Sequence, residues 1–232
     1  ADATCTETST VLTEAPAMIA RYPFDGTLED AVNGNNGSVV SYVDTSAPED
    51  PAFFERLEET PEFFKGIDCT SESALSLNGA NFLHVNYAEG TTLPLTTRGT
   101  FSIAMWVKGD VQQDNRIFSE SSSMRDGTLF NLGTHYQGTD GRVDVYIRSD
   151  GGAAIMEHRL SEAVAFDNTW HHLVWTDNEG QAVLYIDGIP DATDFTYTRG
   201  QLTPDTTTIG GILRQARLPA DPSCCMFAGS ID

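Results

Sequence analysis

The sequence predicts an all-β protein that folds as a sandwich of two antiparallel sheets. From residue 19 onward, short runs rich in β-branched and aromatic residues alternate with clusters of Gly, Asn, Asp and Pro. Hairpin turn signals stand between several of these runs, among them Asn78-Gly79, Asp140-Gly141 and Asp187-Gly188. A sandwich of 232 residues is commonly one domain, so a second domain is not required.

The expected elements follow the chain in a simple order. Segment 1–18 is rich in Thr, Ala and Glu without a clear period, which predicts an N-terminal arm or linker. The domain is expected to span residues 19–232, with excursions from the β pattern at 48–68 and 212–226. The expected strands cover residues 19–24, 38–42, 73–77, 82–85, 100–108, 116–120, 129–133, 142–148, 154–159, 171–177, 181–186 and 206–209.

The first excursion differs from the strands in its spacing of apolar residues. Phe53, Phe54 and Leu57 have the spacing of one or two helical turns, and Pro61 interrupts the segment. We expect the phenylalanines of residues 50–66 to cap the sandwich core. An exposed phenylalanine patch that docks a partner is the alternative.

Alternation within two strands predicts which side chains leave the core. In 101–107 the odd positions are expected to face inward, so Trp106 points away from the core. In a later strand of alternating Val and Ile, Asp144, Tyr146 and Arg148 share one outer face. Such a row also occurs on any solvated antiparallel sheet, so ligand binding and plain solvation both stay open.

The charge of the chain excludes two classes of partner. Thirteen basic residues against 34 acidic ones give a net charge of −21. A surface this acidic repels phosphate backbones and anionic lipid headgroups, so neither nucleic acid nor a membrane surface is expected as a partner. No apolar stretch approaches the length of about eighteen residues that membrane insertion requires. The many carboxylates are suitable ligands for Ca²⁺.

The first residues and the cysteines indicate secretion to the cell surface or the medium. The sequence begins ADATC, the type of end that a signal peptidase leaves. The four cysteines have no zinc spacing and no CxxC pair, so disulfides in an oxidising compartment are expected. The pairing stays open, although adjacent residues are hard to bring to relaxed disulfide geometry. The cysteines are Cys5, Cys69, Cys224 and Cys225. Asn36 begins an Asn-Gly-Ser sequon, which is meaningful in a eukaryotic source.

Six segments together resemble the signatures of laminin-G-like domains, which have the concanavalin A-like jelly-roll fold. They stand in the family's order and span residues 21–232, nearly the whole chain. They are RYPFDGTLED (21–30) with NGNNG (33–37), ALSLNG (74–79), FSIAMWV (101–107), WHHLV (170–174) with VLYIDG (183–188), TIGG (208–211) and FAGSID (227–232). The resemblance implies two sheets packed face to face, with ligands bound at a sheet face or a loop rim. Family members are mostly extracellular recognition modules, adhesion domains or appendages of polysaccharide-degrading enzymes.

Two features depart from the family pattern. The family usually continues past the FAGSID segment with another acidic residue and a final strand. We expect this strand to be trimmed, to belong to a longer parent protein, or to be supplied by a neighbouring subunit through β-augmentation. The second departure is the excursion at 212–226, which holds Arg214, Arg217 and two of the cysteines in an otherwise acidic chain.

The sequence contains no recognisable catalytic motif. Glucanases of this fold place carboxylates on one strand as Glu-x-Asp-x-x-Glu, and no glutamate of this chain begins that pattern. Retaining hydrolysis needs two carboxyl groups about 5 Å apart, and no strand offers such a pair. A lyase that uses His135, Tyr146 and Arg148 is conceivable, but nothing in the sequence shows that the three converge. We therefore expect that the chain is not an enzyme.

The turn-rich loop after the first expected strand is the expected metal site. Asp25, Asp30, Asn33 and Asn35 lie in it, and Ca²⁺ takes six to eight oxygens from carboxylates, amides and carbonyls. Family members often hold a structural Ca²⁺ where this loop meets the closing Ile-Asp strand, which here would add Asp232. The alternative is that these residues are present because they tolerate left-handed turn geometry.

The sequence therefore predicts a non-catalytic, secreted recognition module, carbohydrate-binding or adhesive, with a structural calcium site. Trp106 and Tyr146 are the expected stacking residues for a sugar ring, and Asp144 and Arg148 the expected hydrogen-bonding residues. The partner would be a glycan or an extracellular protein. One alternative is a structural subunit of an extracellular filament or surface assembly that uses the N-terminal arm and an open sheet edge. A polysaccharide-degrading enzyme domain is the other.

Overall fold

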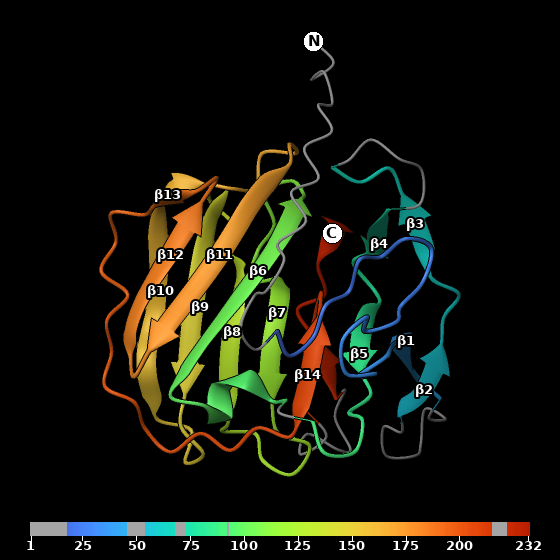
Figure 1. Cartoon of the computed structure of the whole chain (residues 1–232), viewed down its shortest axis with the longest axis horizontal. Coiled ribbons are helices and arrows are strands. Elements are labelled where there is room, and N and C mark those ends of the chain that lie inside the picture. The colour runs from blue at the N-terminus through green and yellow to red at the C-terminus, as the bar shows by residue number, and fades with distance from the viewer. Residues whose placement is uncertain (1–17, 46–53, 68–72, 92, 215–221) are drawn as a thin grey trace.

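Two large antiparallel sheets packed face to face make up the molecule (Figure 1). The computed structural model describes residues 18–45, 54–67, 73–91, 93–214 and 222–232. Within these residues the regular structure is almost entirely strand, with one 3-10 helix, Leu95–Thr97. The prediction of a two-sheet antiparallel sandwich is confirmed. No helix in the described part is long and apolar enough to cross a membrane.

Sheet A has eight strands and sheet B has seven. In spatial order, sheet A contains β10 (Ala154–Val164), β9 (Arg142–Arg148), β8 (Leu129–Thr134), β7 (Arg116–Ser121), β14 (Thr206–Ile209), β5 (Phe82–Val85), β1 (Gly37–Asp44) and β2 (Phe54–Glu58). Sheet B contains β13 (Ile189–Pro190), β12 (Gln181–Ile186), β11 (His171–Asn178), β6 (Thr100–Lys108), β17 (Ala228–Ile231), β4 (Ala74–Asn78) and β3 (Glu62–Phe64). A separate ribbon pairs β15 (Ile212–Leu213) with β16 (Ser223–Cys224).

The core lies between the two sheets and follows the alternation of the strands. In β6 every second side chain is buried while those between are more exposed, as the apolar pattern predicts. Aromatic rings from both sheets meet in this core: Phe130 of β8 lies edge-on to Trp175 of β11, with ring centroids 6.0 Å apart. The sequence pattern therefore fixes which face of each strand is left to solvent or to a ligand.

The first excursion forms strands, so the prediction of helical turns is wrong. β2 pairs with β1 and extends sheet A, whereas β3 pairs with β4 and extends sheet B. Each segment finds an unpaired sheet edge beside it, and pairing with that edge outweighs the helical spacing of the apolar side chains. Phe63 packs against the core and Phe64 is 55% exposed. Phe53 lies outside the described residues.

The structure also bears on the strand expected at 19–24 and on the disulfide pairing. Residues 19–24 do not form the expected strand, because Arg21 exchanges its main-chain bonds with the following turn, through Asp30 and Ala31. Among the cysteines, Cys224 and Cys225 form a disulfide with each other. Cys5 and Cys69 lie outside the described residues, as does most of the expected arm at 1–18.

Candidate functional site

The outer face of sheet A carries a straight row of polar residues, one from each of six neighbouring strands. Their inward-facing neighbours, such as Val145, Phe130 and Ile209, belong to the core, which leaves the row on the outer face. Cross-strand register places each member directly opposite the next. In order, this transverse row consists of Tyr146, Asn131, Ser119, Thr208, His84 and Ser38.

Three members of the transverse row hold polar atoms that are buried without a hydrogen-bond partner. These atoms are both amide atoms of Asn131, Oγ of Ser119 and Nδ1 of His84. Asn131 and Ser119 are both 0% exposed. A buried polar group without a partner costs about 1–3 kcal/mol, and such groups in folded proteins call for an explanation.

The ribbon of β15 and β16 covers one part of this face. Ser121 of β7 donates a hydrogen bond from Oγ to the carbonyl of Leu213, over 2.6 Å. Leu213 packs against Val40 and Phe82, which point outward from β1 and β5. The ribbon contacts β7 and β14. It therefore lies toward the β1 side of Asn131, whereas β9 and β10 bound the row at its other end.

A buried ion pair crosses the face beside the transverse row. Nη1 of Arg116 lies 3.1 Å from Oδ2 of Asp144, and both side chains are almost completely buried. Arg116 also bonds Asp114 through Nη2. The guanidinium passes from β7 to β9 across Gly133, where a Cβ would lie 2.9 Å from Cδ of Arg116. Gly133 therefore makes this pairing sterically possible.

Four aromatic rings form a continuous stack at the β9–β10 end of the row, in the order Tyr146, His158, Tyr136 and His135. The ring of His158 lies 4.2 Å from that of Tyr146, at an interplanar angle of 4°. On its other side the Tyr136 ring lies 4.5 Å away, at 26°. The Arg148 guanidinium lies 5.9 Å from the Tyr146 ring centroid. Such a stack offers flat apolar surface next to polar groups.

The structure brings together three of the four predicted ligand-binding residues. Asp144, Tyr146 and Arg148 lie on the outer face of sheet A, as the alternation predicts. Trp106 belongs to β6 of sheet B and stacks against His172, with ring centroids 4.8 Å apart. Because the outer faces of the two sheets point in opposite directions, Trp106 cannot join the other three in one site.

Sequence reasoning missed the residues that neighbouring strands contribute. Arg116, Asn131 and His158 come from β7, β8 and β10, and their approach to β9 depends on strand register. The alternating pattern marks such residues as outward but does not say which strands are neighbours. His135 stacks on Tyr136, with ring centroids 5.1 Å apart, and its Nδ1 accepts a hydrogen bond from the amide of Gln137. His158, rather than His135, is the histidine that stacks on Tyr146.

The predicted calcium ligands form a hydrogen-bonded turn. The Asp30 carboxylate is buried and accepts main-chain N–H groups of Arg21, Val32, Asn33 and Asn35, together with Nδ2 of Asn35. Burial alone would raise the pKa of Asp30, but these hydrogen bonds outweigh it and hold the pKa below its usual value. A carboxylate surrounded by N–H donors has no oxygen directed at a cation.

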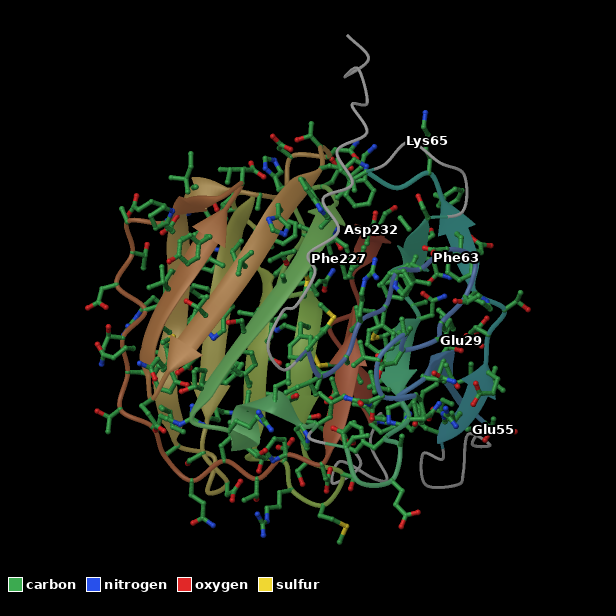
Figure 2. All side chains as sticks on the ribbon, in the orientation of Figure 1. Glu29, Glu55, Phe63, Lys65, Phe227 and Asp232 are labelled. Carbon is green, nitrogen blue, oxygen red and sulfur yellow. A yellow bond between two sulfur atoms is a disulfide. The ribbon has the colours of Figure 1, made fainter. Side chains whose placement is uncertain are left out.

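The other predicted metal ligands do not gather side-chain oxygens around this carboxylate. Nδ2 of Asn33 donates to the carbonyl of Ile19, and Oδ1 of Asn35 accepts from the amide of Ala88. Asp25 and Asp232, the latter labelled in Figure 2, line a cavity that Ile19 and Arg21 also line. As they stand, the five residues do not fit a Ca²⁺ site. In the part of the chain that the structure describes, a single acidic and histidine cluster has metal-site spacing; it consists of Asp114, Asp144 and His158. The Arg116 guanidinium pairs with both of its carboxylates.

The glycosylation prediction falls on an exposed residue. Asn36 is exposed, and its Oδ1 accepts a hydrogen bond of 3.0 Å from the amide of Asp30. A glycan on Nδ2 would leave this acceptor in place.

A cavity of about 1130 Å³ lies away from the transverse row, along β6. Its walls combine residues 18–25 with β6 and with core side chains of both sheets. The cavity shares no residue with the transverse row, so the two are separate features of the surface.

Comparison with known proteins supports the architecture. Residues 83–232 match the model of the concanavalin A-like lectin/glucanases superfamily. Domain 4 of AbnA, a GH43 extracellular arabinanase from Geobacillus stearothermophilus solved with arabinotriose, is similar, with 19% identity and a TM-score of 0.58, over 92% of this chain and 88% of that chain.

Two further solved structures are similar over part of the fold. The CBM40 domain of the Ruminococcus gnavus IT-sialidase has 17% identity and a TM-score of 0.49, over 68% of this chain and 86% of that chain. Domains LG4-5 of the mouse laminin alpha1 chain have 15% identity and a TM-score of 0.43, over 81% and 45%. Of these three likenesses only the arabinanase domain exceeds a TM-score of 0.5, and it shows the fold alone. No curated protein sequence matches the chain.

Proposed function

The chain belongs to the concanavalin A-like lectin/glucanases superfamily, and on this premise we propose that it is a non-catalytic extracellular module that binds carbohydrate on the outer face of sheet A. The observation that carries the proposal is the set of partnerless polar atoms in the transverse row, on Asn131 and Ser119 above all, beside the stacked rings of Tyr146 and His158. Because Asn131 and Ser119 are 0% exposed, a ligand reaches their polar atoms only when the side chains above them move aside. The arabinanase domain of the same fold was solved with a bound arabinotriose, which supports the ligand class.

The chemistry of the face suits a sugar. Sugar hydroxyls both donate and accept, so one hydroxyl satisfies the Asn131 carbonyl and another its amide, without a change of ligand charge. The stacked rings of Tyr146 and Tyr136 supply the flat surface that the apolar side of a sugar ring requires. Around them Asp144 is neutralised by Arg116, so the site favours a neutral polar ligand.

The carboxylates of this face support a binding role over hydrolysis. No single strand offers a carboxylate pair, but Asp114 of the loop before β7 and Asp144 of β9 come together, with carboxylate oxygens within 4.8 Å. This is close to the separation of about 5 Å in retaining glycosidases. Both, however, pair with the Arg116 guanidinium, so neither is available as a nucleophile or as a proton donor. Turnover of an oligosaccharide that Asp144→Asn abolishes would establish the enzyme instead.

The test compares two variants on opposite sheets. Asn131→Leu removes the buried amide, so glycan binding should be lost while stability is unchanged or higher, because an unsatisfied polar group is replaced by an apolar one of similar size. Ser102→Ala changes an exposed residue of sheet B and serves as the matched control. Binding is measured on a broad glycan array, and by calorimetry with arabinotriose as the first single probe.

Three outcomes separate the alternatives. Loss of glycan binding in Asn131→Leu, together with unchanged binding in Ser102→Ala, supports the proposal. Retained binding in this variant places the glycan elsewhere, and binding to no glycan at all turns attention to an extracellular protein as the partner. The filament alternative remains a prediction.

A further inference from the structure

A pocket of about 410 Å³ lies at the end of β6, and both lysines of the chain line it. Lys108 is the last residue of β6, and Lys65 directly follows β3. Figure 2 labels Lys65, whose side chain extends outward from the molecule. Every other basic residue of the chain is an arginine. A chain with a net charge of −21 therefore places both of its lysines at one small site.

Neither lysine is neutralised by a carboxylate. Within the described residues, no ion pair or hydrogen bond engages either ammonium group. The exposed guanidinium of Arg125, for comparison, pairs with Asp150. Asp110 also lines the pocket, which leaves one positive charge in excess among the lining residues. Because charges more than about 8–10 Å apart are largely screened at physiological salt, this local excess favours an anion although the chain as a whole is acidic.

Two aromatic side chains give the pocket apolar walls. Phe63 packs against the core, so the alternation of β3 turns Phe64 outward, where it is 55% exposed and lines the pocket. Trp170, which directly precedes β11, is half-buried and lines the pocket as well. A single exposed phenylalanine needs no explanation, but one that shares a pocket with a tryptophan and two unpaired lysines indicates an interaction site.

The remaining lining favours a peptide over a sugar. A Cβ at Gly109 would lie 2.5 Å from Cζ of Phe227, and one at Gly229 would lie 2.3 Å from the carbonyl oxygen of Lys108. These two positions therefore require glycine and present only main chain to the pocket. A sugar needs several hydrogen-bond partners around its hydroxyl groups. Rings, ammonium groups and glycine main chain instead suit a carboxylate that stands next to an apolar side chain.

We propose that this pocket binds an acidic and partly apolar peptide segment of a partner protein. A Glu or Asp side chain of the peptide pairs with Lys108 and Lys65, and a neighbouring apolar side chain packs against Phe64 and Trp170. This is the docking role that the sequence offers as the alternative for its phenylalanines. The inference goes beyond the glycan site of sheet A and does not rest on it.

The first test uses synthetic peptides and the unmodified protein. An eight-residue peptide that alternates Glu with Leu is compared with one that has Gln in place of Glu and with one that has Ala in place of Leu. Binding is measured by fluorescence polarisation at low and at high salt. Because the chain has two lysines, amine acetylation followed by mass spectrometry reports directly on Lys65 and Lys108.

The second test uses variants. Lys108→Met keeps the apolar stem and removes the charge, and Phe64→Ser removes the exposed ring. Arg125→Met removes one positive charge from an exposed ion pair outside the pocket and is the matched control. The melting temperature of each variant checks that it is folded.

We expect the Glu-Leu peptide to bind, both altered peptides to bind about ten-fold more weakly, and binding to weaken at high salt. The peptide should slow the acetylation of both lysines. Lys108→Met and Phe64→Ser should each weaken binding about ten-fold, whereas Arg125→Met should bind like the wild type.

The opposite results overturn the proposal. Absence of binding, equal binding of the Gln peptide, or an equal loss in Arg125→Met would each reject recognition by this pocket. Protection of both lysines by glucuronic acid but not by the peptide would assign the pocket to acidic sugars and reject a peptide partner. Slower acetylation at high protein concentration without peptide would assign it to a second copy, which also rejects the peptide partner. None of these outcomes depends on glycan binding at sheet A.

Discussion

Nδ1 of His158 lies 2.7 Å from Oδ2 of Asp144, on the outer face of sheet A. A carboxylate only accepts hydrogen bonds, so this contact places a proton on Nδ1. Asp144 is itself held by Arg116, so three strands together orient the histidine. His158 therefore contributes both a hydrogen-bonding group and a stacked aromatic ring to the site.

Replacing His158 should separate these two properties. His158→Phe keeps a ring between Tyr136 and Tyr146 but loses both ring nitrogens, and we expect glycan affinity to fall about ten-fold, or about 1.4 kcal/mol. His158→Ala loses the stack as well and should bind more weakly still. Calorimetry with the best ligand from the array measures both. His172→Phe, at the Trp106 stack of sheet B, is the matched control and should bind like the wild type.

The Arg116–Asp144 pair predicts a large loss of stability when one partner is removed. Arg116→Met leaves a buried carboxylate with no opposite charge, and we expect the free energy of unfolding to fall by about 3–5 kcal/mol in urea denaturation. The double variant Arg116→Met with Asp144→Leu should recover most of this loss. Arg125→Met breaks an exposed pair with Asp150 and should cost less than about 1 kcal/mol. Additive effects of the two buried substitutions would contradict this account.

The Asp30 turn predicts a specific dependence of stability on acid. Because the folded pKa of Asp30 is lowered, its ionised form contributes stability above the unfolded value near 3.9, and this contribution is lost as pH falls through the folded value. Asp30→Asn, which presents an amide to N–H donors, should lower stability at pH 7 by about 2 kcal/mol. The difference between wild type and variant should shrink below about pH 4. A constant difference across pH would assign another role to this side chain.

Calcium binding at the same turn is tested by chelation. Since the Asp30 oxygens accept N–H donors, we expect the melting temperature to be the same with EDTA and with added Ca²⁺. A melting temperature that falls in EDTA and returns with Ca²⁺, but not with Mg²⁺, would support the calcium site predicted from the sequence. Asp30→Asn then serves as the variant in which that response should be absent.

Strand positions were largely predictable because the apolar period of two is a local property. The expected ranges at 82–85, 100–108, 142–148, 181–186 and 206–209 coincide with β5, β6, β9, β12 and β14. The segment that became β2 and β3 was not predictable in this way. Its phenylalanines have helical spacing, and its strands exist because edges of β1 and β4 stand beside it.

From the sequence, only the site residues that share a single strand were predictable. Asp144, Tyr146 and Arg148 follow from the alternation of a single strand, and the structure places all three on one face. Asn131 and Ser119 carry no signal of their own, since their importance comes from being opposite one another and buried. Asp30 and Asn35 carry a polar signal, but the same residue types serve a calcium site and a hydrogen-bonded turn.

The transverse row places one polar side chain from each of six strands at regular steps across sheet A. Neighbouring strands are spaced about 4.8 Å apart, so a chain molecule that lies along the row meets a new side chain at each regular step. Affinity would then grow unit by unit with the length of the oligomer, starting at the Tyr146 end. The gain in affinity with oligomer length should stop where the β15–β16 ribbon covers the face. The protein would then bind only a short stretch of a polymer, and further sugar units would not raise the affinity.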